Sequence, residues 1–169
     1  MHQNDMMIPE GILLIDKPPA KASFYVVAAV RKKTQQKKIG HAGTLDPFAT
    51  GLLILLLGKK WTTQADTFLH HDKEYEATFC LGKATDTYDC DGQIIKESAY
   101  EPTTQEIYTA LDFFQGPYTQ TPPMFSAKKI DGRRLYELAR KGIKVERKTA
   151  NVMLKTTLLR YSYPFLSLR

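Results

Sequence analysis

The sequence predicts an α+β fold in which helices flank one mixed, largely antiparallel central sheet. Short apolar runs typical of strands are interleaved with segments of helical periodicity. These segments do not follow the regular strand–helix–strand alternation that builds a parallel sheet. The chain has 169 residues, of which 43% are hydrophobic, and this suits one domain with its own core. We therefore expect a single domain that covers residues 1–169.

Several segments are expected to be strands. Residues 11–15 form a short apolar run that ends at a charged, proline-containing turn. Residues 52–57 are all apolar, which is typical of a strand that is buried on both faces. Residues 74–81 alternate in strand fashion, with Tyr75 on one face. Residues 152–168 also contain strand-like runs, and the chain ends within one of them, so we expect an unfinished strand there.

Four segments are expected to be helices. Ser23 is placed to cap the first of them. The apolar face of this helix is expected to carry Phe24, Val27 and Val30. Residues 62–69 form a second helix, and Thr103 or Thr104 caps a third. The apolar side of the third helix carries Ile107, Leu111 and Phe114. Residues 135–141 precede a glycine and form the fourth.

The charge balance favours a polyanionic partner. Lysine and arginine number 24 against 18 acidic residues, so the net charge is +6, and a nucleic acid is the first candidate. Five cations cluster at the end of the first helix and just after it, namely Arg31, Lys32, Lys33, Lys37 and Lys38. Cations suit a helix C-terminus, but this density exceeds what the helix dipole requires.

Cysteine usage and hydropathy indicate the compartment. The chain has two cysteines, too few for a small disulfide-stapled fold, so reduced thiols in a cytoplasmic protein are expected. The longest apolar run, residues 52–57, is too short to span a bilayer. Residues 1–10 do not have the pattern of a signal peptide.

Three familiar ligand motifs do not fit the sequence. Residues 58–60 resemble the end of a phosphate-binding loop, but the preceding glycine is missing and Lys60 stands where Ser or Thr is needed. Residues 86–92 resemble a calcium loop, but the first and last ligand positions are not acidic, and a tight Asp-Gly turn explains them equally well. The histidines lack zinc spacing with the cysteines. We expect no metal and no cofactor.

The loop at residues 40–51 is the strongest candidate for chemistry. Its sequence is GHAGTLDPFATG, and three glycines and a proline exclude a regular helix or strand throughout. Asp46 precedes Pro47, which keeps Asp46 extended and favours its display. His41 lies close enough along the chain to share a pocket with it. From the residues alone, a structural turn in which Asp46 bonds its own backbone remains the alternative.

This loop resembles the motif of the TruB family of pseudouridine synthases, and so do other parts of the chain. The agreement runs through consecutive positions of the loop, from Gly40 to Gly51. Further segments resemble family motifs in the same chain order, and they are residues 11–18, 72–75, 85–92, 123–129 and 132–142. The resemblance therefore covers almost the whole chain and implies the pseudouridine-synthase catalytic fold.

The resemblance assigns roles to individual residues. The family's essential catalytic residue is the aspartate of this motif, which corresponds to Asp46. Tyr75 matches the tyrosine that stacks on the flipped uracil, and His41 matches the residue that fills the gap left by the extruded bases. Asp89 matches an acid near the flipped loop. Phosphate contacts are expected from basic residues of the matching segments, namely Lys17, Lys128, Lys129, Arg133 and Arg134.

The implied activity is the isomerisation of uridine 55 in the T-loop of tRNA to pseudouridine. This reaction involves no redox change and no net hydrolysis, so the resemblance implies no cofactor and no metal. The implied partner is the T-arm stem-loop of tRNA. We further expect a monomer in the cytoplasm, with no membrane association.

The chain also departs from the family pattern. Ala20 stands where the family usually has a glycine, and Ile54 where it often has a proline. A later Gly-Thr-Tyr-Ile-Arg-like segment, whose arginine pairs with the catalytic aspartate, is absent, as is a C-terminal RNA-binding domain. We therefore expect a chain that is incomplete at its C-terminus. The alternatives are an RNA-binding fragment without activity and a dyskerin-type synthase that uses guide RNAs on ribosomal RNA.

Overall fold

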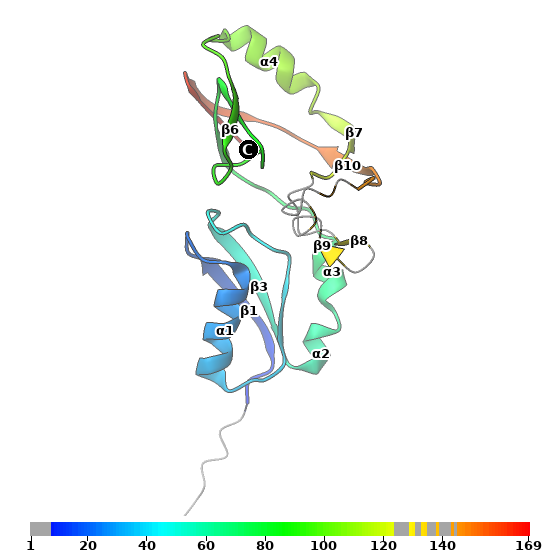
Figure 1. Cartoon of the computed structure of the whole chain (residues 1–169). Coiled ribbons are helices and arrows are strands. Elements are labelled where there is room, and N and C mark those ends of the chain that lie inside the picture. Colours follow the sequence, from blue (N-terminus) through cyan, green and yellow to red (C-terminus); the bar gives the residue numbers. More distant parts are fainter. Residues whose placement is uncertain (1–7, 124–128, 131–132, 135–137, 139–142, 144) are drawn as a thin grey trace, which may run out of the picture. The chain divides into compact units, whose positions relative to one another are not determined.

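The computed structural model describes residues 8–123, 129–130, 133–134, 138, 143 and 145–169. The chain divides into two compact units (Figure 1). Unit 1 is Met1–Lys73, and unit 2 is Glu74–Arg169. Each unit has its own sheets and its own core, so each is described by itself. The expectation that residues 1–169 form a single domain remains a prediction.

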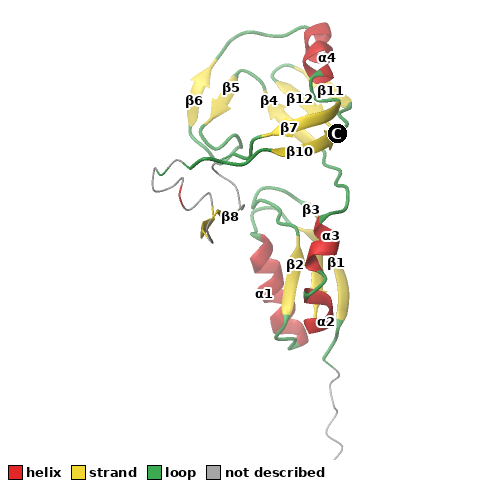
Figure 2. Ribbon diagram, turned by 90° about the vertical axis from the view of Figure 1, so that its right-hand side faces the viewer, coloured by secondary structure: helices red, strands yellow, loops and turns green. Residues whose placement is uncertain are grey.

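Unit 1 is a three-stranded antiparallel sheet with helices packed against it (Figure 2). Its elements in chain order are β1 (Gly11–Lys17), α1 (Ser23–Thr34), β2 (Ile39–Ala42), β3 (Gly51–Leu57), α2 (Lys59–Thr62) and α3 (Ala65–Leu69). The strand order is β1-β3-β2, and β3 pairs along its whole length with β1, from Gly51 opposite Lys17 to Leu57 opposite Gly11. The predicted helix at 62–69 is instead two short helices, with a turn at 63–64 between them.

The core of unit 1 lies between α1 and one face of this sheet. Leu13 pairs with Leu55, and Ile15 pairs with Leu53, so these side chains share a face. They pack against the buried valines of α1. On the opposite face, Leu52 is exposed, so the strand predicted at 52–57 is not fully buried. The exposure on this face falls along the strand, because Leu52 is exposed, Ile54 is half-buried and Leu56 is 0% exposed.

Helix α1 begins differently from the sequence prediction. Its N-cap residue is Ala22, which makes no side-chain capping bond, and Ser23 is its first residue. Phe24 is 64% exposed and does not belong to the buried face. The inward positions are 23, 26, 27 and 30, which is the i, i+3, i+4, i+7 stripe of an amphipathic helix. The prediction was right for Val27 and Val30 and wrong for Phe24, because it started the stripe at the first aromatic residue.

In its described residues, unit 2 consists of short strands and one longer helix. Its elements are β4 (Ala77–Cys80), β5 (Lys83–Thr85), β6 (Ile94–Glu97), α4 (Thr104–Asp112), β7 (Gly116–Gln120), β8 (Lys129–Ile130), β9 (Arg133–Arg134), β10 (Ala150–Leu154), β11 (Leu158–Ser162) and β12 (Phe165–Leu168). The sheets have the orders β11-β12-β4, β10-β7, β5-β6 and β8-β9. Every pairing in both units is antiparallel, as expected, but the described strands form separate small sheets.

Helix α4 and the last strand together form the core of unit 2. Thr103 caps α4 as predicted, and with Glu106 it completes a capping box. Ile107 and Leu111 of α4 are buried against Leu166 of β12. The strand expected to be unfinished, β12, is paired on both sides, with β11 and β4. The helix predicted at 135–141 falls, apart from residue 138, outside the described residues.

Candidate active site

The loop that carries Asp46 connects the end of β2 to the start of β3. The glycines on either side of residues 44–50, Gly43 and Gly51, have φ angles of 91° and 108°, a region that favours glycine. The N–H of Ala49 donates to the carbonyl of Asp46 at 3.1 Å. This bond closes a four-residue turn with Pro47 at its second position, where proline is preferred. Asp46 is an exposed residue at the first position of the turn.

Lys17 bonds to the backbone of this loop through a buried ammonium group. Its side chain is 0% exposed. Its Nζ donates to the carbonyls of Pro18 at 3.0 Å, of Lys21 at 2.7 Å and of Pro47 at 3.2 Å. An ammonium group has three N–H donors, and each has an acceptor here. The phosphate contact predicted for Lys17 therefore does not fit this geometry, because the group is enclosed and its donors are used within the protein.

Ser23 fixes the loop on the other side of Asp46. Its side chain is 3% exposed, and its Oγ both accepts from the N–H of Leu45 and donates to the carbonyl of Leu45, each at 3.0 Å. Ser23 and Lys17 together hold the backbone of both neighbours of Asp46. The sequence prediction missed this role. The available signal is a serine in the first position of the inward stripe of α1, because a buried hydroxyl requires a partner.

The turn before α1 keeps the shape that a glycine would give it. Ala20 has a φ angle of 58°, in the left-handed region. Alanine in this region costs about 1–2 kcal/mol relative to ordinary backbone. The two carbonyls on either side of Ala20, those of Pro18 and Lys21, both accept from Lys17. The departure at position 20 therefore leaves the turn conformation in place, and these bonds help to offset the strain.

His41 is anchored at the start of the loop. It lies in β2, is half-buried, and its Nδ1 contacts the carbonyl of Gly43. A carbonyl oxygen only accepts, so Nδ1 carries the proton. In the neutral ring, Nε2 is then the acceptor nitrogen. His41 is thus tied to the backbone of the Asp46 loop.

The remaining predicted residues belong to unit 2. Tyr75 precedes β4 and is 59% exposed. Asp89 lies in the turn between β5 and β6, where its Oδ1 accepts from the hydroxyl of Thr87 at 2.7 Å and from the N–H of Asp91 at 3.0 Å. One oxygen of Asp89 therefore stabilises the turn itself, which agrees with the structural alternative for this segment. Lys129 is in β8, and its side chain lies outside the described part of the structure.

The predicted site residues thus fall into two groups. Lys17, His41 and Asp46 converge on one loop of unit 1. Tyr75, Asp89 and Lys129 occupy separate elements of unit 2. The structure identifies one further residue at the first group, Ser23.

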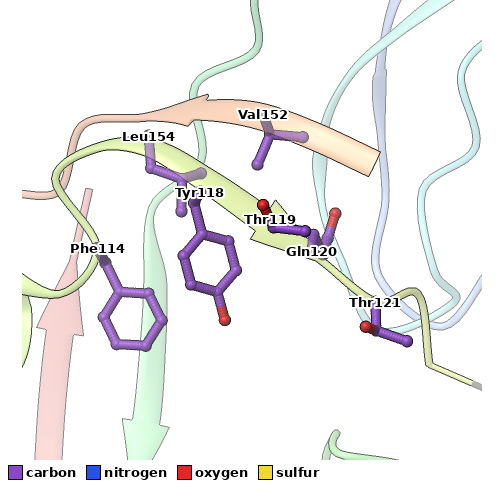
Figure 3. Close-up of a pocket in the computed structure, with 7 residues that line it drawn as sticks. All are labelled: Phe114, Tyr118, Thr119, Gln120, Thr121, Val152 and Leu154. Atoms are coloured by element: carbon purple, nitrogen blue, oxygen red, sulfur yellow. The ribbon is translucent and has the colours of Figure 1, made fainter. Parts of the chain in front are cut away.

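Unit 2 also has a hollow that the sequence did not predict (Figure 3). It lies over β7 and β10 and contains none of the predicted site residues. Its lining residues are Phe114, Tyr118, Thr119, Gln120, Thr121, Val152 and Leu154. The rings of Phe114 and Tyr118 lie beside each other with their centroids 5.5 Å apart. The hollow therefore offers an aromatic wall and polar threonine and glutamine groups.

Among the described residues, no group of three or more His, Cys, Asp or Glu side chains could hold a metal ion. In the same part of the chain, no helix has the length and apolar character required to cross a membrane.

Comparisons with known proteins give a consistent result. Residues 31–169 match the family described as TruB family pseudouridylate synthase (N terminal domain). The chain is 54% identical over 160 residues to tRNA pseudouridine synthase B of Protochlamydia amoebophila, covering 95% of this chain and 61% of that protein. It is 50% identical over 159 residues to tRNA pseudouridine synthase B of Chlamydia pneumoniae, covering 94% of this chain and 68% of that protein. The chain thus spans roughly two thirds of the length of these relatives.

Solved structures share the fold. A chain of a Cbf5-Nop10-Gar1 complex aligns with a TM-score of 0.67 at 24% identity, covering 99% of this chain and 40% of that chain. A chain of an H/ACA RNP bound to a substrate RNA containing 2'-deoxyuridine aligns with a TM-score of 0.64 at 22% identity, covering 99% of this chain and 39% of that one. At these identities the likeness concerns the fold alone.

Proposed function

The chain belongs to the TruB family of pseudouridylate synthases, and on that premise we propose that it isomerises uridine 55 in the T-loop of tRNA to pseudouridine. The observation that carries this proposal is the exposed Asp46, whose two backbone neighbours are held by the buried side chains of Lys17 and Ser23. A reactive carboxylate must be held in place to act on one atom of a substrate. The relatives named tRNA pseudouridine synthase B support the choice of RNA.

The proposed reaction conserves every atom of the uridine apart from exchange of protons. The bond between ribose C1′ and base N1 breaks, the uracil turns, and C5 forms a bond to C1′. C5 loses its proton and N1 gains one. The carboxylate of Asp46 serves as nucleophile or as base in this sequence, which are the roles open to an ionised carboxyl group.

The substrate base is stacked within folded RNA and must leave the stack to reach a carboxylate. In this proposal Tyr75 stacks on the flipped uracil, which its exposure permits. His41 fills the gap in the RNA, and its bond to Gly43 supports such a fixed position. Asp89 accepts a hydrogen bond from base or sugar, and Lys129 contacts a phosphate.

The proposal also covers the RNA partner, the location and the oligomeric state of the chain. We propose that the T-arm stem-loop is the recognised element, as the family resemblance implies, and that the chain is a cytoplasmic monomer. Sedimentation equilibrium gives the mass directly. The mass of the chain is 19.2 kDa, and a measured mass of twice this value would contradict the monomer.

The test of activity is tritium release from a T-arm RNA labelled at C5 of its uridine. Asp46→Asn keeps the shape of the side chain and removes its charge, so we expect release to fall to background while RNA binding is retained. Asp66→Asn makes the same change at an exposed aspartate of α3 and should leave release intact. Release by Asp46→Asn at the parental rate excludes the assigned role. RNA binding without release by the parent chain assigns it RNA binding without catalysis.

A second prediction concerns Tyr75. Tyr75→Phe keeps the ring and should retain most activity, whereas Tyr75→Leu removes the stacking face and should lose about 1–3 kcal/mol of base binding. Tritium release at limiting RNA distinguishes the two variants. Equal activities would remove Tyr75 from the site.

A further inference from the structure

Seven cations of unit 1 come from three segments of the chain and form one surface, which we name the basic end. Its members are Arg31, Lys32 and Lys33 in the last turn of α1, Lys37 and Lys38 in the connection to β2, and Lys59 and Lys60 at the start of α2. All six lysines are exposed, and Arg31 is half-buried. The function proposed above uses none of these residues.

The sheet brings these segments to one edge. Ile39 pairs with Leu57, and the N–H of Gly58 donates to the carbonyl of Lys38 at 2.7 Å, so Lys38 lies beside the residues that lead into α2. The end of α1, the connection and α2 all lie at the same end of the sheet (Figure 1). The Asp46 loop joins β2 to β3 at the opposite end. Seven residues of β3 separate the two ends, a span of about 20 Å at 3.3 Å per residue.

The positive excess of unit 1 is concentrated at the basic end. Unit 1 has ten lysines and arginines against six acidic residues, and seven of the ten lie here. Glu10 contributes one carboxylate, because its side chain lies against Gly58, at 2.5 Å from the place a Cβ would take there. The rest of unit 1 therefore has more acidic than basic residues. A cluster of this kind repels itself unless an anion neutralises it.

Stability of the fold explains only part of this cluster. Arg31, Lys32 and Lys33 interact favourably with the C-terminal end of the α1 dipole. Lys59 and Lys60 lie in α2, a single turn of four residues, so the dipole of a long helix does not account for them. Lys60 lies over the ring of Trp61, with its Nζ 5.4 Å from the ring centre. Lys37 and Lys38 lie in a connection between elements. The helix dipole therefore does not explain these four exposed lysines.

We propose that the basic end binds the sugar–phosphate backbone of RNA, about 20 Å from the Asp46 loop by the strand rise of β3. Lysine ammonium groups are mobile point charges that bind phosphates without reading sequence. The inference rests on the proposed function because the RNA is the one whose uridine reaches Asp46. Binding at both ends of the sheet orients a helical stem along unit 1 while the target loop lies at the aspartate.

The test compares two quadruple variants with the same loss of charge. One is Lys37→Gln, Lys38→Gln, Lys59→Gln and Lys60→Gln. The control is Lys83→Gln, Lys96→Gln, Lys148→Gln and Lys155→Gln, which removes four exposed lysines of unit 2. The probe is a T-arm stem-loop RNA with an extended stem, and its binding to the full chain is measured by fluorescence anisotropy across a salt series.

We expect the basic-end variant to bind at least about tenfold more weakly near 0.1 M salt, with a salt slope lower by about 2–3, as the loss of that many phosphate contacts predicts. The control should change affinity by less than about threefold, since it removes net charge but not this surface. Equal losses in the two variants overturn the inference, because net charge alone then explains binding. An unchanged basic-end variant also overturns it and leaves the proposed function intact.

Two further outcomes are informative. If the parent chain does not bind the RNA, the proposed function and the inference fail together. Vesicles of phosphatidylcholine and phosphatidylserine test the other polyanionic surface. If the basic-end variant loses vesicle binding but keeps its affinity for RNA, the surface recognises lipid headgroups and the inference is wrong.

Discussion

The two units hold their predicted functional residues by different means. In unit 1, buried side chains bond to the backbone on both sides of Asp46, and these bonds come from Lys17 and Ser23. In unit 2, Tyr75 is exposed beside a short strand, and Asp89 lies in a surface turn. The comparison indicates that unit 1 holds the backbone around the proposed catalytic Asp46 from distant segments, whereas unit 2 holds Asp89 only within its own turn and leaves Tyr75 exposed.

The core of unit 1 also has more buried residues than the core of unit 2. In the described part of the chain, the core cluster of unit 1 contains six buried residues from α1 and the three-stranded sheet, with four more packed against it. The cluster of unit 2 contains three, from α4 and β12, also with four more packed against it. Both strands β4 and β6 of unit 2 are exposed along their length. Because burial of apolar area is the main stabilising term, unit 1 should resist local opening more strongly.

The largest expected effect tests this difference with one chemical change in each core. Leu55 is 0% exposed at the centre of the unit 1 cluster, and Leu166 is 7% exposed in unit 2. We expect Leu55→Ala to cost about 3–5 kcal/mol and Leu166→Ala about 2–3 kcal/mol, because the more tightly packed site leaves the larger cavity. Urea unfolding measures both values. A larger loss for Leu166→Ala would reverse the comparison.

The sequence predicted the parts of the fold that depend on local pattern. The strand at 11–15, the cap at Thr103 and the buried positions Ile107 and Leu111 agree with the structure. Glycine and proline excluded a regular helix or strand throughout the Asp46 loop, and the resemblance to the TruB motif singled out Asp46. Long-range pairing was not predicted, so the separation of the strands into small sheets was missed.

The errors at the site have a common physical cause. Lysine is almost always exposed, so Lys17 was predicted to contact phosphate, whereas its ammonium is enclosed by three carbonyls. Ser23 was predicted to cap α1, whereas it bonds Leu45 across 22 positions of sequence. In both cases a polar group is buried because a distant backbone needs a partner. Composition and spacing do not reveal such partners.

The next largest effect is expected when the side chains that hold the Asp46 loop are removed. Lys17→Met keeps much of the stem and removes the donors, so three carbonyls lose their partner and stability should fall by about 2 kcal/mol. Ser23→Ala leaves both backbone groups of Leu45 unpaired and should cost about 1–2 kcal/mol. Hydrogen exchange should accelerate at Leu45 and Ala49 in both variants.

A matched change at an exposed lysine controls for loss of charge. Lys21 lies near α1 with its Nζ 4.7 Å from the ring centre of Tyr25, an exposed contact. Lys21→Met should cost less than about 1 kcal/mol. If Lys17→Met and Lys21→Met destabilise the protein equally, the enclosed ammonium has no special role in holding the loop.

The smallest expected effect concerns unit 2 and depends on pH. Glu106 accepts hydrogen bonds from the hydroxyl of Tyr100, and from the N–H and hydroxyl of Thr103 at 2.8 Å and 2.7 Å. These bonds, that of Tyr100 first, lower the pKa of Glu106 below its ordinary 4.5. The bond to Glu106 also raises the pKa of Tyr100 above 10.0. The hydrogen bond between Tyr100 and Glu106 therefore affects the titration of Glu106 at acidic pH and that of Tyr100 at alkaline pH.

The sign of the pH effect follows from the lowered pKa of Glu106. A carboxyl group whose pKa is lower in the folded state stabilises the fold above its unfolded pKa of 4.5, and this contribution disappears as pH falls through the folded pKa. Glu106→Gln should therefore flatten the loss of α4 stability below that pH, and it should shift the tyrosinate titration of Tyr100 to lower pH. Glu97→Gln removes an exposed carboxylate of β6 and should change neither. If the stability of α4 depends on pH identically in the parent and in Glu106→Gln, the ionised carboxylate of Glu106 does not stabilise the cap of α4. Unit 2 would then differ from unit 1 in lacking a side chain that stabilises its backbone through charge.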